Sequence, residues 1–424
     1  MPPVSQFRIV LMSSSVSPLT FFQPSEVRRQ AHRLLDLAQA GTLAHVGVDL
    51  AKLGDALVTV LETTRETYPD FQIPPYGIWR DFEAGGIDRW GAMASARNFE
   101  TAEDMLAAAT DLAVLGTFMK TRHPQGWTFE DRMTGTVATG RQASALAAFH
   151  MFAAGSFSAE MTDPYRVDAE TLIRFDTQEL AFGLQWDPER DAGLLEHMQR
   201  HLKRLGEALA LRPDLFSEGD ATRPGLLATR LAKDSDGTVS AGKLLDHLLE
   251  SLAPVWDGGA QEGEISLGDS FAHSALPDDD AASAVPFHLA AQEMVYALVE
   301  PFAWAGLEVD GLADLTPPAD EIHAGLFVDS GVMKIKTAAD ALTFQGEQDR
   351  MTELRAVSSA LTDRLAELLR GELEVPEEQL PLTCILEGGT HRAGRGILER
   401  GTDEWGNLER FMNPGSVFWL PFGA

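Results

Sequence analysis

The sequence predicts a mainly α-helical fold. Apolar residues recur at helical spacing along most of the chain, and the alternating patterns typical of strands are few. Apolar residues make up 44% of the 424 residues, which is enough for a sizeable core. We therefore expect a helical globular protein with little sheet.

The first helical pattern lies just after residue 24. Five apolar residues fall on one face of this helix: Val27, Ala31, Leu34, Leu35 and Ala38. Ser25 is the expected N-cap, and Gly41 is the expected stop signal.

Similar patterns predict the remaining helices in chain order. We expect them over residues 48–67, from Thr101 onward, and over 141–154, 191–210, 240–253, 285–305 and 350–371. Asp104 follows Thr101 at the spacing of a capping box. The best strand patterns are residues 325–329 and 331–336, which predict a short β-hairpin near 325–336.

Polar and glycine-rich stretches mark weak domain boundaries. They predict an N-terminal extension over residues 1–23 and a helical N-terminal domain over 24–215. A second helical domain, expected to carry the active site, covers 216–400, and a C-terminal extension covers 401–424.

The charge of the chain excludes several functions. The sequence has 34 Lys and Arg against 64 Asp and Glu, a formal net charge of −30. A surface this acidic repels phosphate backbones and anionic lipids, so neither nucleic acid nor a membrane is an expected partner. The apolar runs are too short for a membrane span or a signal peptide, which predicts a cytoplasmic protein.

The sequence predicts no metal, redox or cofactor site. Cys384 is the single cysteine, and its apolar neighbours favour a buried thiol over a nucleophile. His197 and His201 share a helix face, but the glutamate of a zinc-protease motif is missing beside them. Surface histidines on an amphipathic helix are therefore the expected interpretation.

Two further motifs resemble known sites but fit them poorly. The GTVSAGK segment matches a P-loop up to its lysine, yet Leu244 stands where a magnesium-binding Ser or Thr is needed. A loop with Ser240 as a helix N-cap is the favoured alternative. The GDS segment at residues 268–270 resembles a serine-esterase motif but lies past mid-chain in a predicted loop.

Four segments concentrate polar residues beside glycine, proline or tryptophan. The first, WRDFEAGGIDRW, places four candidate binding residues around a Gly-Gly turn: Trp79, Arg80, Asp88 and Arg89. Their charges predict an ion-pair cluster that either is structural or lines a pocket.

Two more of these segments carry polar groups that need partners. In VPFHLAAQ, His288 and Gln292 lie one turn apart on an otherwise apolar helix, so each needs a partner in the protein or in a ligand. In LEGGTHRAGRG, Thr390 and Arg395 accompany glycines that expose backbone N–H groups. This segment is either an anion site or an ordinary turn between helices.

The remaining segment, LTPPADEIHAGLFVD, sets acidic residues beside a proline-rich turn. Asp320 and Glu321 follow the prolines, and Asp329 ends the apolar run. A rigid turn of this kind holds carboxylates at the edge of a cleft. Capping of a helix by Asp320 is the plain alternative.

Together these segments resemble a family that acts in uracil catabolism, in the branch of fungal and bacterial pyrimidine degradation that passes through ribosylurea. The resemblance runs from about residue 24 to residue 395. It rests on ordered motifs: WR, FEAGG and DRW within 79–90, MFAAGSFS at 151–158, RVDA at 166–169, LGD at 267–269, PFH at 286–288, EP and WAG within 300–306, GLFVD at 325–329, and LEGGT with GR within 386–395.

The second half also resembles, more distantly, the queuosine-salvage nucleosidases. Their helical core is similar to that of helix-hairpin-helix DNA glycosylases. The matching positions, in order, are Gln292, Leu315-Thr316, Ala319-Asp320 and Glu353-Leu354-Arg355.

These resemblances imply hydrolysis of an N-ribosyl bond in a ribosylurea-like or modified nucleoside substrate. Asp320 is the implied carboxylate beside C1′, with Asp329 as the second acid. Glu353 and Arg355 are expected to hold ribose hydroxyls or a carboxylate partner.

The same resemblance assigns the other polar residues to the substrate. His288 and Gln292 are expected to recognise the urea or base. Arg80, Arg89 or Arg395 is expected to take a 5′-phosphate if the substrate carries one.

This sequence departs from the family pattern at polar positions. Leu289 stands in place of a usual lysine, Ala143 in place of a glutamate, and the turn at 320–323 lacks the family's tyrosine and arginine. These departures favour a divergent member with a different substrate or weakened chemistry. Two alternatives stay open: a non-catalytic protein that binds a nucleoside-like ligand, and a biosynthetic paralogue that transfers the glycosyl group to an acceptor other than water.

Overall fold

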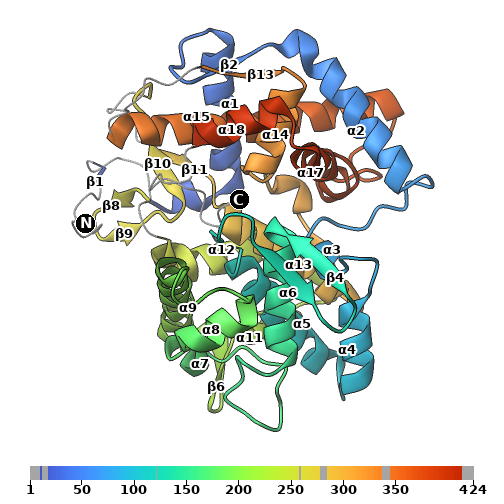
Figure 1. Cartoon of the computed structure of the whole chain (residues 1–424), viewed down its shortest axis with the longest axis vertical. Coiled ribbons are helices and arrows are strands. Elements are labelled where there is room, and N and C mark those ends of the chain that lie inside the picture. The colour runs from blue at the N-terminus through green and yellow to red at the C-terminus, as the bar shows by residue number, and fades with distance from the viewer. Residues whose placement is uncertain are drawn as a thin grey trace. The chain divides into compact units, whose positions relative to one another are not determined.

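The structure confirms a mainly α-helical fold (Figure 1). The computed structural model describes residues 10–11, 18–120, 122–256, 259–276, 284–336 and 344–412. These form two compact units. The first unit takes its residues from Met1–Tyr76, Trp256–Gln292 and Gly311–Leu420, and the second from Gly77–Val255 and Glu293–Asp310. The boundaries expected at 23, 215 and 400 stay a prediction.

The first unit is built around three helices, α1, α14 and α15, with α15 packed against both others (Figure 1). Its α-helices are α1 (Pro24–Gln39), α2 (Leu53–Thr67), α14 (Glu321–Asp329), α15 (Phe344–Leu373), α16 (Leu382–Ile385), α17 (His391–Arg400) and α18 (Asp403–Met412). The unit also has 3₁₀ turns at Pro18–Phe22, Leu50–Lys52 and Leu312–Asp314. A π-helical turn lies at Leu386–Thr390. Helix α13 (Leu289–Trp304) begins in this unit and continues into the second.

The strands of the first unit form only short pairs. They are β1 (Val10–Leu11), β2 (Val46–Val48), β8 (Gln261–Glu262), β9 (Ile265–Ser266), β10 (Ser270–Ala272), β11 (Ala284–Pro286) and β13 (Met333–Ile335). Strand β8 pairs with β1 in parallel and with β9 antiparallel, while β10 pairs antiparallel with β11 and β13 with β2.

The predicted hairpin near 325–336 is wrong. Residues 325–329 belong to helix α14, and only Met333–Ile335 form a strand, which pairs with Val46–Val48. An apolar run of five residues is compatible with a buried strand or with a buried helix. The N-cap at Asp320 decides in favour of the helix, which is buried on all sides from Glu321 to Val328.

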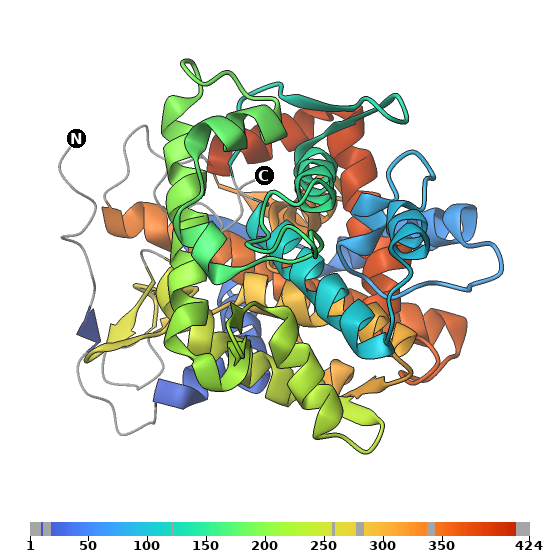
Figure 2. The same ribbon diagram turned by 90° about the horizontal axis from the view of Figure 1, so that it is seen from below.

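The second unit contains the remaining described elements. Its helices are α3 (Trp79–Phe82), α4 (Arg89–Arg97), α5 (Ala102–Phe118), α6 (Gly140–Ala153), α7 (Ala169–Ile173), α8 (Thr177–Leu184), α9 (Ala192–Leu211), α10 (Pro213–Phe216), α11 (Gly225–Lys233) and α12 (Ala241–Leu252), with a 3₁₀ turn at Ala253–Val255. Helix α9, green in Figure 2, packs against α7, α8 and α12. Its strand pairs are β3 (Thr128–Asp131) with β4 (Thr136–Thr139), β5 (Ser217–Glu218) with β6 (Ala221–Thr222), and β7 (Thr238–Ser240) with β12 (Glu308–Asp310).

Local capping signals explain several helix starts. The Thr101 hydroxyl accepts a hydrogen bond from the Asp104 amide at 3.0 Å and donates to the Asp104 carboxylate at 2.7 Å, so this predicted cap is confirmed. Ser240 caps α12 as predicted. Helix α1 instead begins at Pro24 with Gln23 as its N-cap, so the assignment to Ser25 is wrong, because proline at the first helical position fixes the start.

Close packing of α14 against its neighbours depends on two glycines. A Cβ atom at Gly394 of α17 would lie 2.3 Å from the carbonyl oxygen of Ile322. A Cβ atom at Gly325 of α14 would lie 2.3 Å from the indole of Trp405 on α18. Because the Ile322 oxygen belongs to the backbone, it cannot move aside without shifting the helix.

We predict that Gly394→Ala separates α17 from α14 and lowers the free energy of unfolding by about 1–3 kcal/mol. Gly371→Ala is the matched control, because this residue of α15 has no atom within 4 Å of the added Cβ. That variant should be neutral or more stable by up to about 1 kcal/mol, the helix preference of alanine over glycine. Urea denaturation followed by circular dichroism measures both, and equal effects would contradict the packing argument.

Candidate functional site

A buried polar cluster of the first unit contains Asp320, the residue that the family resemblance assigns to chemistry. Asp320 is the N-cap of α14, and its Oδ1 accepts a hydrogen bond from the His323 amide at 2.9 Å. The same oxygen lies 2.7 Å from His323 Nδ1, and His323 Nε2 lies 3.0 Å from the Thr390 hydroxyl. All three side chains are buried. We call Asp320, His323 and Thr390 the Asp320 cluster.

The His323 ring joins the two other members of the Asp320 cluster. Its Nδ1 lies within hydrogen-bond distance of the Asp320 carboxylate, which can accept from it. Its Nε2 lies within hydrogen-bond distance of the Thr390 hydroxyl. The result is a continuous hydroxyl–imidazole–carboxylate chain in which each bond is strengthened by the low local dielectric. Capping by Asp320, the plain alternative at the sequence level, is therefore present together with this chain.

The proline-rich turn before Asp320 is held by side chains from other helices. Pro317 and Pro318 carry no amide hydrogen, so these two residues cannot donate a backbone hydrogen bond within the turn. Gln292 accepts from the Thr316 amide at 2.8 Å and donates to the Thr316 hydroxyl at 2.7 Å. The Ser359 hydroxyl of α15 donates to the Pro317 carbonyl at 3.1 Å. The partner that Gln292 requires is thus this turn.

Arg355 holds the last residue before Asp320. Its Nε donates to the Ala319 carbonyl at 3.2 Å, and its two terminal nitrogens donate to Asp269 at 2.7 and 2.6 Å. The guanidinium also lies over the Phe287 ring, 4.0 Å from its centroid. Both partners of this bidentate ion pair are 2% exposed. Arg355 is therefore a positioning residue for Asp320.

Asp269 is the main residue of this site that the sequence argument missed. Besides binding Arg355, its Oδ2 accepts from the Leu289 amide at 3.1 Å, at the start of α13. The available signal was the LGD motif at 267–269, which was used for the family resemblance and in an esterase-like GDS segment but was not assigned to the site. His323 was likewise noted only where the turn departs from the family pattern.

Two other predicted residues fasten different parts of the first unit. Glu353 accepts from the amides of His45 and Val46, both at 2.8 Å, and so anchors β2 to α15. His288 has a left-handed backbone with φ 50°, and its Nε2 lies 2.6 Å from the Phe21 carbonyl. Burial lowers the pKa of His288, so this imidazole is neutral and donates to that carbonyl.

The remaining predicted residues of the first unit differ in their distance from Asp320. Glu321 is the buried first residue of α14. Asp329 is the last residue of that helix, and nine residues of helical rise place it about 13 Å further along the axis. Arg395 lies on α17, and its guanidinium lies 3.9 Å from the carboxylate of Glu399 on the same helix. The structure does not bring Asp329 into the Asp320 cluster.

Four predicted binding residues belong to the second unit and make contacts within it. Trp79 is buried and donates from Nε1 to the Ala297 carbonyl at 2.6 Å. Arg80 binds both carboxylate oxygens of Glu300 at 2.8 and 3.0 Å. Asp88 caps α4 by accepting from the Gly91 amide at 2.7 Å.

Arg89 is also buried. It binds Asp131 through two nitrogens at 3.0 and 2.8 Å and also donates to the carbonyls of Phe82 and Ala84. These bonds join the start of α4 to strand β3. The predicted ion pairing within the WRDFEAGGIDRW segment is present between Arg80 and Glu83 at 3.1 Å, and both arginines also bind an acid outside the segment.

The motifs that fitted known sites poorly have structural roles. His201 is buried, and burial lowers its pKa to about 3, so it is uncharged; its ring stacks on Phe118. The Cys384 thiol donates to the Ile73 carbonyl at 3.3 Å, and burial raises its pKa, which keeps it protonated. Among the described residues, no three His, Cys, Asp or Glu side chains are grouped to hold a metal ion. No described helix is both long and apolar enough to cross a bilayer.

The fold and this site define a mainly helical protein with a buried carboxylate–imidazole–hydroxyl cluster. The chain belongs to the family described as "protein of unknown function (DUF1688)", whose model matches residues 20–405. It is similar to Protein urg3 of Schizosaccharomyces pombe, with 26% identity over 393 residues that cover 88% of this chain and 92% of the relative.

A second relative carries a more informative name. The chain is similar to Uracil catabolism protein 4 of Lachancea kluyveri, with 24% identity over an alignment of 446 residues that covers 95% of this chain and 99% of the relative. This confirms the family resemblance predicted from the motifs. At such identity the chain is a divergent member, and the likeness to queuosine-salvage nucleosidases stays a prediction.

We predict that Arg355→Met lowers the free energy of unfolding by about 3–5 kcal/mol, because it leaves the Asp269 carboxylate buried without its counter-charge. Arg364→Met on the same helix is the matched control: the Arg364 side chain is 48% exposed, with Glu367 3.9 Å away. It should change stability by no more than about 0.5 kcal/mol.

A double variant distinguishes the effect of the unpaired buried charge on stability from the effect of lost side-chain packing. Asp269→Leu with Arg355→Met removes both buried charges, so it should be more stable than Arg355→Met alone. Urea denaturation of all three variants is the measurement. A double variant that is less stable than the single one would contradict the role assigned to the buried charge.

Proposed function

We propose that this chain hydrolyses an N-ribosyl bond in uracil catabolism, with Asp320 as the catalytic carboxylate. The observation that carries the proposal is the buried Asp320 cluster, in which His323 and the start of α14 fix the carboxylate. The relative named Uracil catabolism protein 4 supports the pathway. A ribosylurea-like compound or a modified nucleoside is the substrate class.

The chemistry requires a fixed negative charge beside the anomeric carbon. When the C1′–N bond breaks, its electron pair goes to the leaving nitrogen and positive charge develops on the sugar. A carboxylate that is already oriented stabilises this charge without reorganising, and a low dielectric strengthens the effect. Water then adds to C1′, and the proton that it loses ends on the leaving nitrogen.

The neighbours of Asp320 supply the orientation. His323 contributes two donors to Oδ1, one from its backbone and one from its ring, so the carboxylate has one rotamer. Arg355 and Gln292 hold the turn that precedes it. Orientation by such bonds matters because a small displacement of a catalytic group lowers the rate by orders of magnitude.

We predict that Asp320→Asn lowers kcat by at least about 10²-fold, because the amide cannot balance positive charge on the sugar. Asparagine is a good N-cap, so α14 should still form and the thermal unfolding temperature should change little. Asp329→Asn, at the other end of α14, is the matched control and should keep the wild-type rate.

The assay incubates the protein with ribosylurea and a panel of nucleosides and measures free sugar, urea and base by mass spectrometry. Equal rates for wild type and Asp320→Asn would reject the role of Asp320. Thermal stabilisation by a ligand without release of sugar would favour a binding protein, and sugar attached to another acceptor would favour a transferase.

A further inference from the structure

A π-helical turn, Leu386–Thr390, lies between α16 and α17 in the first unit. Such turns are rare, and they occur mostly as single turns within α-helices, frequently at functional sites. Their hydrogen bonds join residues five apart instead of four, so they change which face of the helix the following side chains occupy. All five residues of this turn are buried. The turn is therefore a defined part of the interior.

Two glycines let this turn pack directly on α2 and on the residues that follow α2. A Cβ atom at Gly388 would lie 2.9 Å from Cδ1 of Ile73. A Cβ atom at Gly389 would lie 2.6 Å from Cγ1 of Val60 on α2. Any larger residue at either position would push the turn away from these neighbours. The glycines thus fix the distance between the π-helical turn and α2.

The start of the turn is held by a buried carboxylate. Glu387 is 4% exposed, and its Oε1 accepts from the Tyr68 hydroxyl at 3.0 Å and from the guanidinium of Arg392. Burial and the charge of Glu387 raise the pKa of Tyr68 to about 12, so the phenol keeps its proton and donates the hydrogen bond. Arg392 also lies over the Tyr68 ring, 5.5 Å from its centroid. These contacts fasten the turn to the end of α2 and to the first turn of α17.

The end of the turn presents a hydroxyl to His323. Thr390 Oγ1 lies 3.0 Å from His323 Nε2, and His323 Nδ1 lies 2.7 Å from Oδ1 of Asp320. Thr390 and His323 are both 0% exposed. A buried ring that has a polar partner at each nitrogen cannot rotate without losing one of them, which is costly in an interior. The hydroxyl therefore fixes the plane of the ring against the carboxylate.

We propose that Thr390 is a positioning residue for Asp320: the π-helical turn delivers its hydroxyl to His323, and the ring held in this way orients the carboxylate. The family resemblance placed Thr390 among residues that bind the substrate. Because the residue is fully buried, we assign its effect to His323 instead. The expected effect on rate rests on the proposed hydrolase, whereas the effect on the His323 ring can be measured without any activity.

Nuclear magnetic resonance of the protein labelled with ¹⁵N in its histidine rings tests the contact. Thr390→Val keeps the shape of the side chain but removes the hydroxyl, so the ring nitrogen resonances of His323 should shift. Thr390→Ser keeps a hydroxyl and should restore them toward their wild-type positions. His323→Gln identifies the signals of this ring by their loss. Thr390→Ala, which removes the same hydroxyl without adding volume, replaces Thr390→Val if that variant does not fold.

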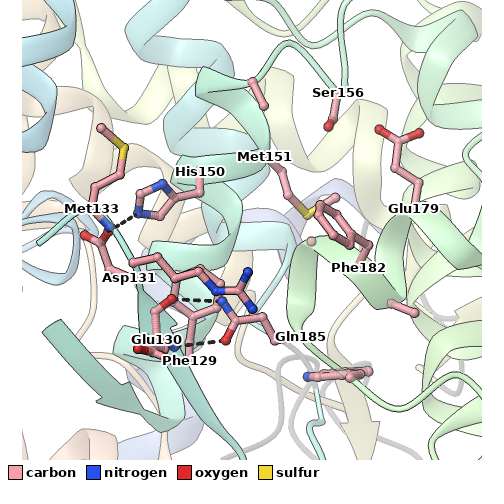
Figure 3. Close-up of a pocket in the computed structure, with 15 residues that line it drawn as sticks. Phe129, Glu130, Asp131, Met133, His150, Met151, Ser156, Glu179, Phe182 and Gln185 are labelled. Atoms are coloured by element: carbon pink, nitrogen blue, oxygen red, sulfur yellow. Dashed lines mark hydrogen bonds and ion pairs between the residues drawn. The ribbon is translucent and has the colours of Figure 1, made fainter. Parts of the chain in front are cut away.

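The second unit supplies the controls. His150 Nε2 lies 3.3 Å from Oδ1 of Asp131 beside a pocket of that unit, so this pair is an internal reference (Figure 3). Its resonances should be the same in wild type and in Thr390→Val. Thr117→Val is the matched variant, because it removes another fully buried hydroxyl, which donates to the Ala113 carbonyl within α5 at 2.8 Å. It should leave the His323 resonances unchanged.

The rate of N-ribosyl hydrolysis is the second readout. Thr390→Val should lower kcat about tenfold with little change in KM, because the orientation of the carboxylate matters most in the transition state. Thr390→Ser should recover most of the wild-type kcat. A residue that only stabilises the fold would instead change the unfolding temperature and leave kcat of the folded protein as it was.

The two readouts distinguish failure of this inference from failure of the proposed function. Unchanged His323 resonances in Thr390→Val would overturn the inference, whatever the activity of the wild type. Shifted resonances with an unchanged kcat in an active protein would also overturn it. If the wild type cleaves no N-ribosyl compound, shifted resonances still support the positioning of His323 by Thr390, and the failure lies with the hydrolase alone.

Discussion

The buried ion pair between Asp269 and Arg355 is the constraint on which the first unit depends. Two opposite charges in a protein interior lose their hydration, and they are tolerated only when geometry and further hydrogen bonds compensate. Here the pair is bidentate, and each partner also binds backbone: Asp269 takes the first amide of α13, and Arg355 takes the carbonyl just before Asp320. The starts of α13 and α14 are therefore fixed to one point on α15.

This arrangement explains how a turn with two prolines holds the Asp320 carboxylate in place. Pro317 and Pro318 have no amide hydrogen, and the turn is held by Gln292, Ser359 and Arg355 on two helices. The family resemblance assigned Gln292 to the urea or base, and Arg355 to ribose hydroxyls or a carboxylate partner. In this structure Arg355 has a carboxylate partner, Asp269, and both residues also bind the turn that carries Asp320.

Local signals in the sequence predicted local structure well, and they failed where partners are distant. The capping box at Thr101 and the need of Gln292 for a partner both follow from residues a few positions apart. Asp269 is 86 residues from Arg355, and Arg89 is 42 residues from Asp131. A single sequence does not indicate which two charged residues form such a pair, because each partner alone looks like any other charged residue.

The departures from the family pattern gain a physical meaning once the structure is known. The turn at 320–323 lacks the family's tyrosine and arginine, and His323 at its end binds Asp320 directly. The His323 amide donates to the Asp320 carboxylate, and its ring lies against the same oxygen. Through His323 the carboxylate is also linked to Thr390 on the segment that leads into α17. The turn therefore fixes its carboxylate through a side chain of the same turn, at a place where the sequence departs from the family pattern.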